Sequence, residues 1–489
     1  MRSRPRLFAI AATALFVASA CGGGTSSPGP QSSGVGVPGG SGPVNTQPPG
    51  TFAPPSFSPA AMRWYCCLGT GEDPEQQPVE KQVADAFATA YPGSSLKFEV
   101  ITYDDARNTL ATQIRGGNAP DVVGPVGIGG VAAFSGQWLD LGPYIAKTNF
   151  DMSQYDPAVV NFWKSDKDGQ VGIPFDVFPS MVWYKKDMFQ EAGLQEPPHK
   201  YGDKYAMPDG TQVDWSYDTV KQIAMKLTVD KNGKDATETG FDAGNIVQYG
   251  FEPQRDDLRG LGAYWGAGSL AGGADGKTAT IPEPWKAAWK FFYDGMWKDH
   301  FIMTGPVFAK DEFGGTLGYA FFSGRVAMSE NFLWTTYGVK DAGPDWDLAA
   351  IPSYNGKVTS PLNADTFTLL KGGKNPDAAF TAATELIAGE NSDKLLQAYG
   401  GMPARADKQD AFFEQLGQSE GFPDKVDWQV AKDSIQYADI PNFEAAMPKY
   451  NETLDILGKY MSKWTTTPGL DIDSEITKLQ AEIQKAWDS

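Results

Sequence analysis

The histidines and cysteines of this chain are too few for the commonest kinds of catalytic site. The sequence contains two histidines, His199 and His300, and three cysteines, Cys21, Cys66 and Cys67. A zinc site needs three or four such ligands close together, and a nucleophilic triad needs a histidine beside its serine or cysteine. We therefore expect no metal site, no cofactor and no enzymatic activity.

Cys66 and Cys67 are adjacent and could form a disulfide between neighbouring residues. Adjacent cysteines strain that bond, so two small buried thiols are an equal alternative. The 60 acidic residues also supply many carboxylate pairs of the kind that glycoside hydrolases use, so hydrolysis stays open as an alternative.

Three glycine- or aspartate-rich motifs resemble ligand loops, but their surroundings do not fit. Residues 127–132 satisfy a dinucleotide fingerprint without the acidic residue that should follow, although a helix N-terminus could still approach a ligand there. Residues 271–278 lack the first glycine of a phosphate loop and indicate a turn. Residues 230–235 carry Lys234 where a calcium loop needs a ligand.

The N-terminus has the three parts of a secretory signal. Arginines in the first six residues precede the apolar run Leu7–Val17 and then the small residues Ala18–Ala20. The run is too short for a membrane span, so we expect residues 1–20 to be removed. The cysteine at the cut resembles the bacterial lipoprotein signal, which predicts a lipid anchor on Cys21 at the outer face of the membrane. An ordinary secreted protein is the alternative.

Residues 21–60 are predicted to be a disordered tether. They consist largely of glycine, serine, proline, threonine and glutamine, which cannot bury enough apolar surface to fold. A flexible chain of this length spans on the order of 35 Å. The tether would let a folded body range above a membrane.

The full chain is acidic, with a formal net charge of −19, and the loss of the signal arginines would make the remaining body more negative still. Such a body repels nucleic acid and anionic lipid, and it accommodates a neutral or cationic ligand more easily than an anion. The roughly 430 remaining residues are enough for one large unit or two lobes.

Strands and helices are expected to alternate in the first part of the body. The pattern predicts strands at 62–68, 96–100 and 121–123 and helices at 79–90 and 106–115. This alternation is typical of a mostly parallel sheet whose ligand crevice lies at the carboxyl ends of its strands. The loops 67–74, 124–129 and 175–180 should then share one edge. Further along, we expect helices at 189–192, 220–227, 285–296, 378–387, 393–398 and 472–487, and strands at 173–184, 348–351 and 366–370.

Several short motifs, none decisive alone, occur together in one order that resembles family 1 of the extracellular solute-binding proteins, the sugar-capturing lipoproteins of ABC importers. These motifs are Ala119–Val123, Leu139–Leu141 with Pro143–Ile145, Gly172–Phe175, Trp183–Phe189, Ala192–Leu194 with Pro197–Pro198, Phe321–Met328, Ile351–Pro352, Asn375–Phe380 and Gly400–Arg405.

The resemblance implies an α/β, two-lobed periplasmic-binding-protein-like fold of type II. Each lobe would have a central β-sheet flanked by helices, with the ligand cleft between the lobes. It places residues 61–177 and 355–405 in lobe 1 and residues 178–354 and 406–489 in lobe 2. The chain would cross between the lobes near 175–181, 351–354 and 405–412.

The sequence departs from the family pattern at two places, so the ligand of a family member cannot be assigned to this chain. Residues 199–214 separate Pro197–Pro198 from Trp215–Asp218, which usually follow closely, and Asn363–Asp365 stand where the family has a glycine pair.

A sugar cleft needs flat aromatic rings for the apolar faces of the sugar and polar groups for its hydroxyls. Trp334 matches the aromatic residue that stacks on sugar in a family member, although a tryptophan is more often part of a core. Glu72 and Asp73 follow the first strand, and Asp365 with Arg405 could equally be a structural ion pair. The predicted ligand residues are Glu72, Asp73, Phe175, Asp176, Phe178, Tyr264, Trp265, Glu330, Asn331, Trp334, Asn363, Asp365, Arg405 and Trp428.

The sequence therefore predicts an exported, lipid-anchored receptor that closes on a mono- or oligosaccharide and delivers it to the permease of an ABC transporter. We expect it to work as a monomer, without nucleic acid, in the periplasm or outside the cell. The alternatives are a surface glycoside hydrolase and a receptor of the same fold for a non-sugar solute such as a polyamine.

Overall fold

The computed structural model describes residues 51–489 except 256, 274–275, 315–318, 344, 419–421, 423–424 and 445–446, and it leaves the side chains of residues 337 and 340–342 undescribed. The predicted signal peptide, Cys21 and residues 21–50 of the predicted tether lie outside this part of the chain.

The main sheet runs in the order β13-β6-β15-β3-β1-β2, and β14 and β16 also pair with β6. Its strands are β1 (Ala61–Cys66), β2 (Ser95–Val100), β3 (Val122–Gly127), β6 (Ile173–Lys185), β13 (Met328–Phe332), β14 (Trp346–Ala349), β15 (Leu362–Leu369) and β16 (Met402–Pro403).

The sheet is mixed, so the prediction of a mostly parallel sheet is wrong. Strand β1 pairs in parallel with β2 and β3, as the alternation of strands and helices predicted. The other five ladders of this sheet are antiparallel. The reason is that β15 is reached by a long excursion of the chain rather than by a helical crossover, and it enters between β3 and β6 in the opposite direction.

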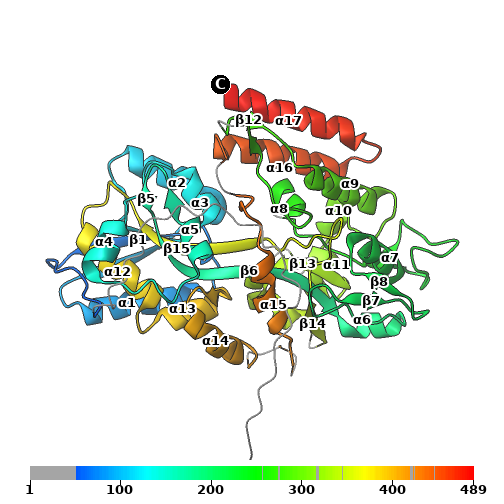
Figure 1. The fold of residues 1–489 in the computed structure, drawn as a ribbon, viewed down its shortest axis with the longest axis horizontal. Coiled ribbons are helices and arrows are strands. Elements are labelled where there is room, and N and C mark those ends of the chain that lie inside the picture. Colours follow the sequence, from blue (N-terminus) through cyan, green and yellow to red (C-terminus); the bar gives the residue numbers. More distant parts are fainter. Residues whose placement is uncertain are drawn as a thin grey trace, which may run out of the picture. The chain divides into compact units, whose positions relative to one another are not determined.

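Strand β6 takes part in two groups of strands. Its first half, Ile173–Pro179, pairs with β15, and its second half, Ser180–Lys185, pairs with β13 and β14. All thirteen of its residues are buried. Figure 1 shows β6 running from the strands and helices on the left of the view to those on the right.

The helices cover both faces of this sheet. In Figure 1, α1, α12 and α13 lie below β1 and β15, whereas α2 and α3 lie above them. The helices are α1 (Gln77–Ala90), α2 (Tyr103–Arg115), α3 (Ile128–Ala133), α4 (Gly142–Thr148), α5 (Pro157–Phe162), α6 (Lys186–Glu191), α7 (Tyr217–Leu227), α8 (Leu258–Ala263), α9 (Glu283–Trp297), α10 (Gly305–Phe308), α11 (Asp311–Gly314), α12 (Pro376–Ala388), α13 (Ser392–Tyr399), α14 (Gln409–Leu416), α15 (Gln429–Ser434), α16 (Tyr450–Thr466) and α17 (Ile472–Asp488), with short 3-10 turns at η2 (Ala320–Ser323), η3 (Leu333–Ala342), η4 (Ala406–Lys408) and η5 (Ile435–Tyr437).

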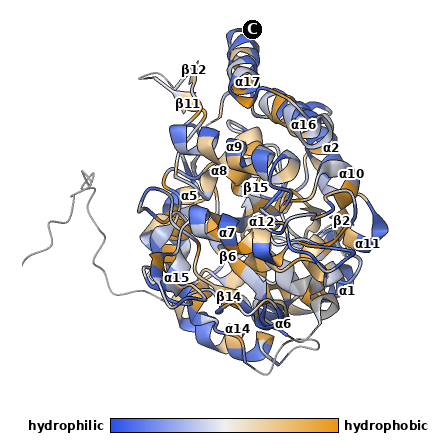
Figure 2. Ribbon diagram, turned by 90° about the vertical axis from the view of Figure 1, so that its right-hand side faces the viewer, coloured by the Kyte–Doolittle hydropathy of each residue, from blue (hydrophilic) through white to orange (hydrophobic). Residues whose placement is uncertain are grey.

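Local sequence explains where several helices begin and which face they bury. Ser216 caps α7 by accepting a hydrogen bond from the amide of Thr219, and Asp471 caps α17 in the same way. Helix α17 buries Ile476, Leu479 and Ile483, which recur at helical spacing. Figure 2 shows hydrophilic and hydrophobic stretches in turn along it.

Two large hydrophobic cores hold the body together. The first core gathers residues of β1, β2, β3, β15, α1, α12 and α13, and the second gathers residues of α7, α8, α9, α16 and α17. Phe412, Phe413 and Val430 pack in the first core, although the predicted lobe boundaries give them to lobe 2. The division into lobes at those boundaries stays a prediction.

Small hairpins lie in the loops on either side of α7. They are β7 (Lys204–Ala206) with β8 (Gln212–Asp214) and β9 (Val229–Asp230) with β10 (Ile246–Gln248). Two further hairpins join β4 (Lys164–Ser165) to β5 (Gly169–Gln170) and β11 (Ala271–Gly272) to β12 (Thr278–Ala279).

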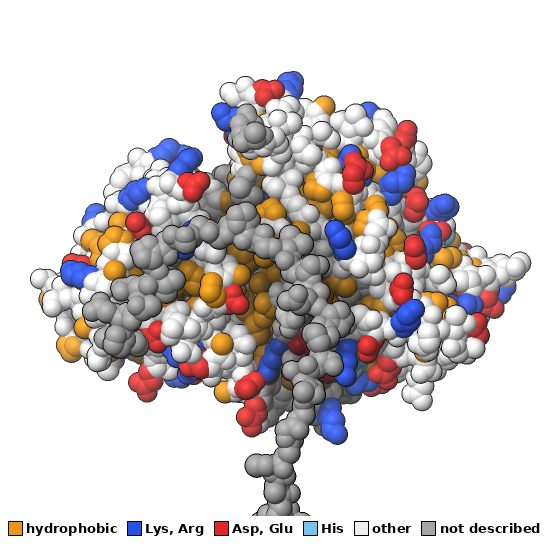
Figure 3. Space-filling view, viewed as in Figure 1, with side chains coloured by type: hydrophobic (Ala, Val, Ile, Leu, Met, Phe, Trp, Pro, Cys, Tyr) orange, Lys and Arg blue, Asp and Glu red, His pale blue; other side chains and the backbone are white. Residues whose placement is uncertain are grey.

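The last ten residues of the predicted tether lie against the body without forming a helix or strand. The amide of Ala53 donates to the carbonyl of Thr148, and the rings of Phe52 and Phe150 meet edge to face. Elsewhere, acidic and basic side chains are interspersed over the face drawn in Figure 3.

Within residues 51–489, the described helices include none both long and apolar enough to cross a membrane.

Candidate functional site

A cavity of about 650 Å³ opens where elements of the two cores meet. Its walls come from the loop after β1, from α2, from the end of β3, from β15 and, on the side of the second core, from α8 and α16. Small-molecule sites in proteins have this size and tend to lie between two packed units.

The loop after β1, residues 68–73, forms one wall of the cavity. The amide and the hydroxyl of Thr70 both donate to Oδ2 of Asp365 at 2.9 Å. The backbone amide of Tyr103 donates to the carboxylate of Glu72 at 2.5 Å. These bonds tie the loop to β15 on one side and to α2 on the other.

Asp365 forms a buried pair of carboxyl groups with Asp176. The backbone amide of Asp365 donates to Oδ1 of Asp176 at 3.0 Å, and the two residues are 4% and 0% exposed. Burial raises the pKa of Asp365 to about 6, and burial together with the neighbouring Asp365 raises the pKa of Asp176 well above its usual range. At this corner of the cavity, a negative charge on both carboxyl groups at once is therefore unfavourable.

The opposite wall holds a buried cation. Arg259 is 1% exposed, and its guanidinium donates to the carboxylate of Asp257 at 2.6 Å. The guanidinium also lies 5.8 Å from the ring of Phe443 and 5.4 Å from that of Tyr450. Asp257 caps the N-terminus of α8 as well, so one carboxylate both holds the arginine and begins the helix.

The glycine-rich segment 127–132 does reach the cavity, at the start of α3. The amide of Gly129 donates to Oε2 of Glu444 at 3.1 Å, so a carboxylate of this chain occupies the start of the helix. A side chain at Gly129 would collide with the hydroxyl of Tyr450. Glycine is required here because α16 approaches the backbone so closely.

The aromatic residues of the cavity lie on both of its sides. Trp334 stacks on Phe332 with ring centres 4.2 Å apart and meets Phe178 edge to face, and its Nε1 donates to the hydroxyl of Tyr319. On the other side, the guanidinium of Arg107 lies 4.9 Å from the ring of Tyr103. Aromatic faces beside polar groups suit a ligand that presents both apolar and hydroxyl surface.

Carboxylates outnumber cations in the walls. The described lining residues include seven acids and two arginines, Arg107 and Arg259. Arg259 is already paired with Asp257, so the remaining charge of the cavity is negative. The acids are Glu72, Asp73, Asp104, Asp257, Asp365, Glu444 and Asp455.

The structure brings six of the fourteen predicted ligand residues to this cavity. They are Glu72, Asp73, Phe178, Trp334, Asn363 and Asp365. The predicted common edge of the loops 67–74 and 124–129 is found, because Leu68 bridges to Val126. Residues 175–180, however, are the interior of β6 and not a loop.

The other eight predicted residues do not line the cavity. Phe175, Tyr264 and Trp265 are buried among other rings, and Trp428 stacks on Phe413. Arg405 pairs with Asp407, so the suggested ion pair with Asp365 does not form. Asp176, Glu330 and Asn331 are buried in the sheet, where Glu330 accepts a hydrogen bond from Tyr217.

Sequence reasoning missed the residues that α2, α8 and α16 bring to the cavity. An aspartate directly before Leu258 is a helix-capping signal that could have located α8, and Leu454, Leu457 and Met461 recur at helical spacing in α16. The residues missed on or next to these helices are Tyr103, Asp104, Arg107, Asp257, Arg259, Tyr450, Leu454, Asp455 and Gly458, and those missed elsewhere include Gln76, Tyr319 and Glu444.

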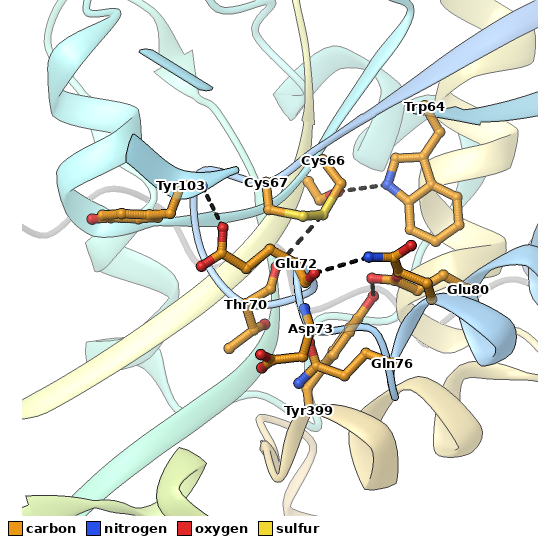
Figure 4. The surroundings of a disulfide bond; sticks show 12 residues. Trp64, Cys66, Cys67, Thr70, Glu72, Asp73, Gln76, Glu80, Tyr103 and Tyr399 are labelled. Atoms are coloured by element: carbon orange, nitrogen blue, oxygen red, sulfur yellow. Dashed lines mark hydrogen bonds between the residues drawn. A yellow bond between two sulfur atoms is a disulfide. The ribbon is translucent and has the colours of Figure 1, made fainter. Parts of the chain in front are cut away.

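The two adjacent cysteines lie directly behind the loop after β1. Cys66 and Cys67 are joined by a disulfide, and both are buried. Figure 4 shows this disulfide beside Thr70, Glu72 and Asp73. Among the described residues we find no group of three or more histidine, cysteine or acidic side chains arranged to hold a metal ion.

Residues 82–420 match the profile of a family described as bacterial extracellular solute-binding proteins. A Brucella abortus protein that is named a binding protein is 23% identical to this chain over 345 residues, which are 68% of this chain and 74% of that protein.

Two solved structures share the fold. The ABC substrate-binding protein Lmo0181 of Listeria monocytogenes, in complex with cycloalternan, has a TM-score of 0.68 and 18% identity, covering 88% of this chain and 99% of that one. The sugar-binding protein MalE of Xanthomonas citri has a TM-score of 0.65 and 15% identity, covering 88% and 97%. The fold class predicted from the sequence is confirmed by these neighbours.

Proposed function

Because the chain belongs to the bacterial extracellular solute-binding proteins, we propose that it captures a mono- or oligosaccharide in the cavity and performs no chemistry on it. The observation that carries this proposal is the cavity itself, which combines the ring of Trp334 with hydrogen-bonding groups such as those of Asn363 and Asp73. Sugar rings need both kinds of contact. The sugar-binding protein of Xanthomonas with the same fold supports it.

The mechanism that we propose is closure around the ligand. A sugar that contacts both walls binds the shut form more tightly than the open one, and this difference in affinity shifts the population toward closure. The loop after β1 and Asn363 would contact the sugar from one side, and Trp334 and α16 from the other. Closure would then be what a membrane permease recognises.

The lipid anchor on Cys21 and the delivery to an ABC permease belong to the same proposal. They are supported by the form of the N-terminal segment and by the membership of the family, whose members are extracellular. A multiply acylated cysteine would hold the receptor at the outer face of the membrane, because several acyl chains bind a bilayer firmly.

A second candidate is a receptor of the same fold for an amine-bearing solute. The excess of carboxylates in the walls favours it, since a cation would offset their mutual repulsion.

Calorimetric titration of the full-length chain tests these functions. The panel contains glucose, maltose, maltotriose, cellobiose and, for the second candidate, spermidine. The recovered ligand is then analysed by chromatography. We expect one of the sugars to bind with a Kd of about 1 μM or tighter and to be recovered intact. A cleaved sugar would show a hydrolase, binding of spermidine alone would show the second candidate, and binding of none would contradict both receptor proposals.

A further inference from the structure

The disulfide of Cys66 and Cys67 lies at the end of β1, one residue before the wall of the cavity begins. The backbone of the pair is fixed to the end of β2, because the amide of Ile101 donates to the carbonyl of Cys66 at 2.7 Å and the amide of Cys67 donates to that of Ile101 at 3.2 Å. Both cysteines are fully buried, so the sulfur atoms do not reach the cavity themselves.

The loop after β1 folds back over the two sulfur atoms. Gly71 has a φ of +113°, and a Cβ there would lie 2.8 Å from Sγ of Cys66 and 3.2 Å from Sγ of Cys67. The carbonyl of Thr70 is 3.7 Å from Sγ of Cys66. The sulfur pair is therefore the surface on which Thr70 and Gly71 rest, as Figure 4 shows for Thr70.

Gly71 is also confined from the side of α1. A Cβ at Gly71 would lie 2.5 Å from Oε1 of Glu80, and that oxygen accepts a hydrogen bond from the hydroxyl of Tyr399 at 2.7 Å. Glu80 is fully buried and held in place, so it cannot easily move away. Gly71 thus has little room between the disulfide and Glu80.

The other side of the same loop faces the cavity. Thr70 donates two hydrogen bonds to Asp365, and Glu72 accepts one from the amide of Tyr103. All residues from Leu68 to Asp73 line the cavity. A displacement of Gly71 would therefore move its neighbours, and with them the groups that a ligand would contact.

Reduction would displace Gly71 for a simple steric reason. Two electrons and two protons convert the disulfide into two thiols, and two sulfur atoms that share no bond must stand further apart than bonded ones. Because Gly71 lies against both sulfur atoms, their separation would crowd it.

We propose that the Cys66–Cys67 disulfide is a positioning element of the binding cavity: it supports the loop of residues 68–73, and its reduction loosens that loop and weakens ligand binding. The part that concerns affinity rests on the proposed function, whereas the part that concerns the loop does not. An exported protein meets an oxidising environment, in which the bond would persist.

The experiment compares the full-length chain before and after treatment with a phosphine reductant. Alkylation and mass spectrometry count the free thiols at Cys66 and Cys67, and hydrogen exchange measures the amides of residues 68–76. Titration with maltotriose, or with whichever panel sugar binds, gives the Kd. We expect reduction to speed exchange in this segment and to raise the Kd by roughly tenfold, which corresponds to about 1.4 kcal/mol.

Two variants make the test specific. Cys66→Ser with Cys67→Ser should show fast exchange and weak binding without reductant and should not respond to it, which also controls for Cys21. Gly71→Ala should loosen the same segment while the disulfide stays intact, because the added methyl meets the sulfur atoms.

Free thiols in the untreated protein, or unchanged exchange at residues 68–76 after verified reduction, would overturn the positioning role. Faster exchange with an unchanged Kd would overturn the link to affinity. If no sugar binds at all, the proposed function fails, but the exchange data still decide whether the disulfide supports the loop. If the double variant does not fold, reduction of the unchanged chain decides.

Discussion

At the scale of single residues, a substitution of Trp334 gives the most direct test of the proposed sugar binding. It lines the cavity, and Phe332 fixes its orientation by stacking on it. A ring that stacks on a sugar contributes through its area, so Trp334→Ala should raise the Kd of the bound sugar by roughly tenfold. Titration calorimetry measures this change.

The matched control for that change is Trp428→Ala. Trp428 is also an aromatic residue packed against another ring, that of Phe413, but it does not line the cavity. Its removal should leave the Kd within about twofold. Equal losses of affinity in the two variants would remove the stacking role of Trp334.

Glu330 gives a prediction about pH at the same scale. Burial raises its pKa to about 8, while the hydrogen bond from Tyr217 opposes that rise. The folded protein keeps a proton on Glu330 that the unfolded chain releases above its ordinary pKa of 4.5. The stability that this group contributes therefore falls as the pH rises from about 5 to 8, by at most about 1.4 kcal/mol per pH unit.

Glu330→Gln should flatten this decline, since the amide keeps an acceptor for Tyr217 and does not titrate. Urea unfolding at pH 5, 6, 7 and 8 measures the difference from the unchanged chain. Glu452→Gln, on the exposed surface of α16, serves as the control. A decline that is as steep in the Glu330 variant as in the control would contradict the buried, protonated state.

At the scale of elements, the close approach of α3 and α16 determines how one side of the cavity is built. Gly129→Ala would place a methyl against the hydroxyl of Tyr450 and push the two helices apart. We expect a loss of about 1–3 kcal/mol in stability and weaker sugar binding, as is typical of overpacking. Thermal unfolding and calorimetry would measure both effects.

Gly458→Ala is the matched control, because Gly458 lies on α16, lines the same cavity and has free space around it. Alanine there should be neutral or slightly stabilising, since it favours the helix. Combining Gly129→Ala with Tyr450→Phe should restore part of the loss. A tolerated Gly129→Ala alone would show that the helices can separate without cost.

Elements are also the scale at which the sequence was most informative, and the reasons for success and failure are physical. The strands and helices up to residue 123 follow from apolar spacing, because β1 pairs in parallel with β2 and β3 and α1 packs on β2. The direction of β15 could not be predicted in this way, since it depends on where the chain returns after a long excursion. Aromatic residues such as Trp265 were misplaced because a ring that packs in a core and a ring that faces a ligand look alike in sequence.

At the scale of the whole molecule, charge restricts the ligand. The chain has a formal net charge of −19, and the cavity repeats this excess of acids locally. We predict that the uronic acid analogue of the bound sugar binds on the order of tenfold more weakly than the neutral sugar. Calorimetry at low and high salt tests this, and added salt should narrow the gap because it screens charges.

If the uronic acid analogue binds as tightly as the neutral sugar at low salt, the charge of the cavity does not restrict the ligand. The neutral sugar itself is the control, because its affinity should change little with salt.

Because β6 pairs with strands of both groups, a gene for this protein cannot be cut within β6 without leaving strands unpaired. A cut of the gene at residue 180 leaves β3 and Ile173–Pro179 in one fragment and their partner β15 in the other, whereas β13 and β14 stay with Ser180–Lys185. Each half would then expose an unsatisfied, apolar edge of the kind that invites aggregation. The body should therefore be expressed, and joined to any other protein, as one uncut piece.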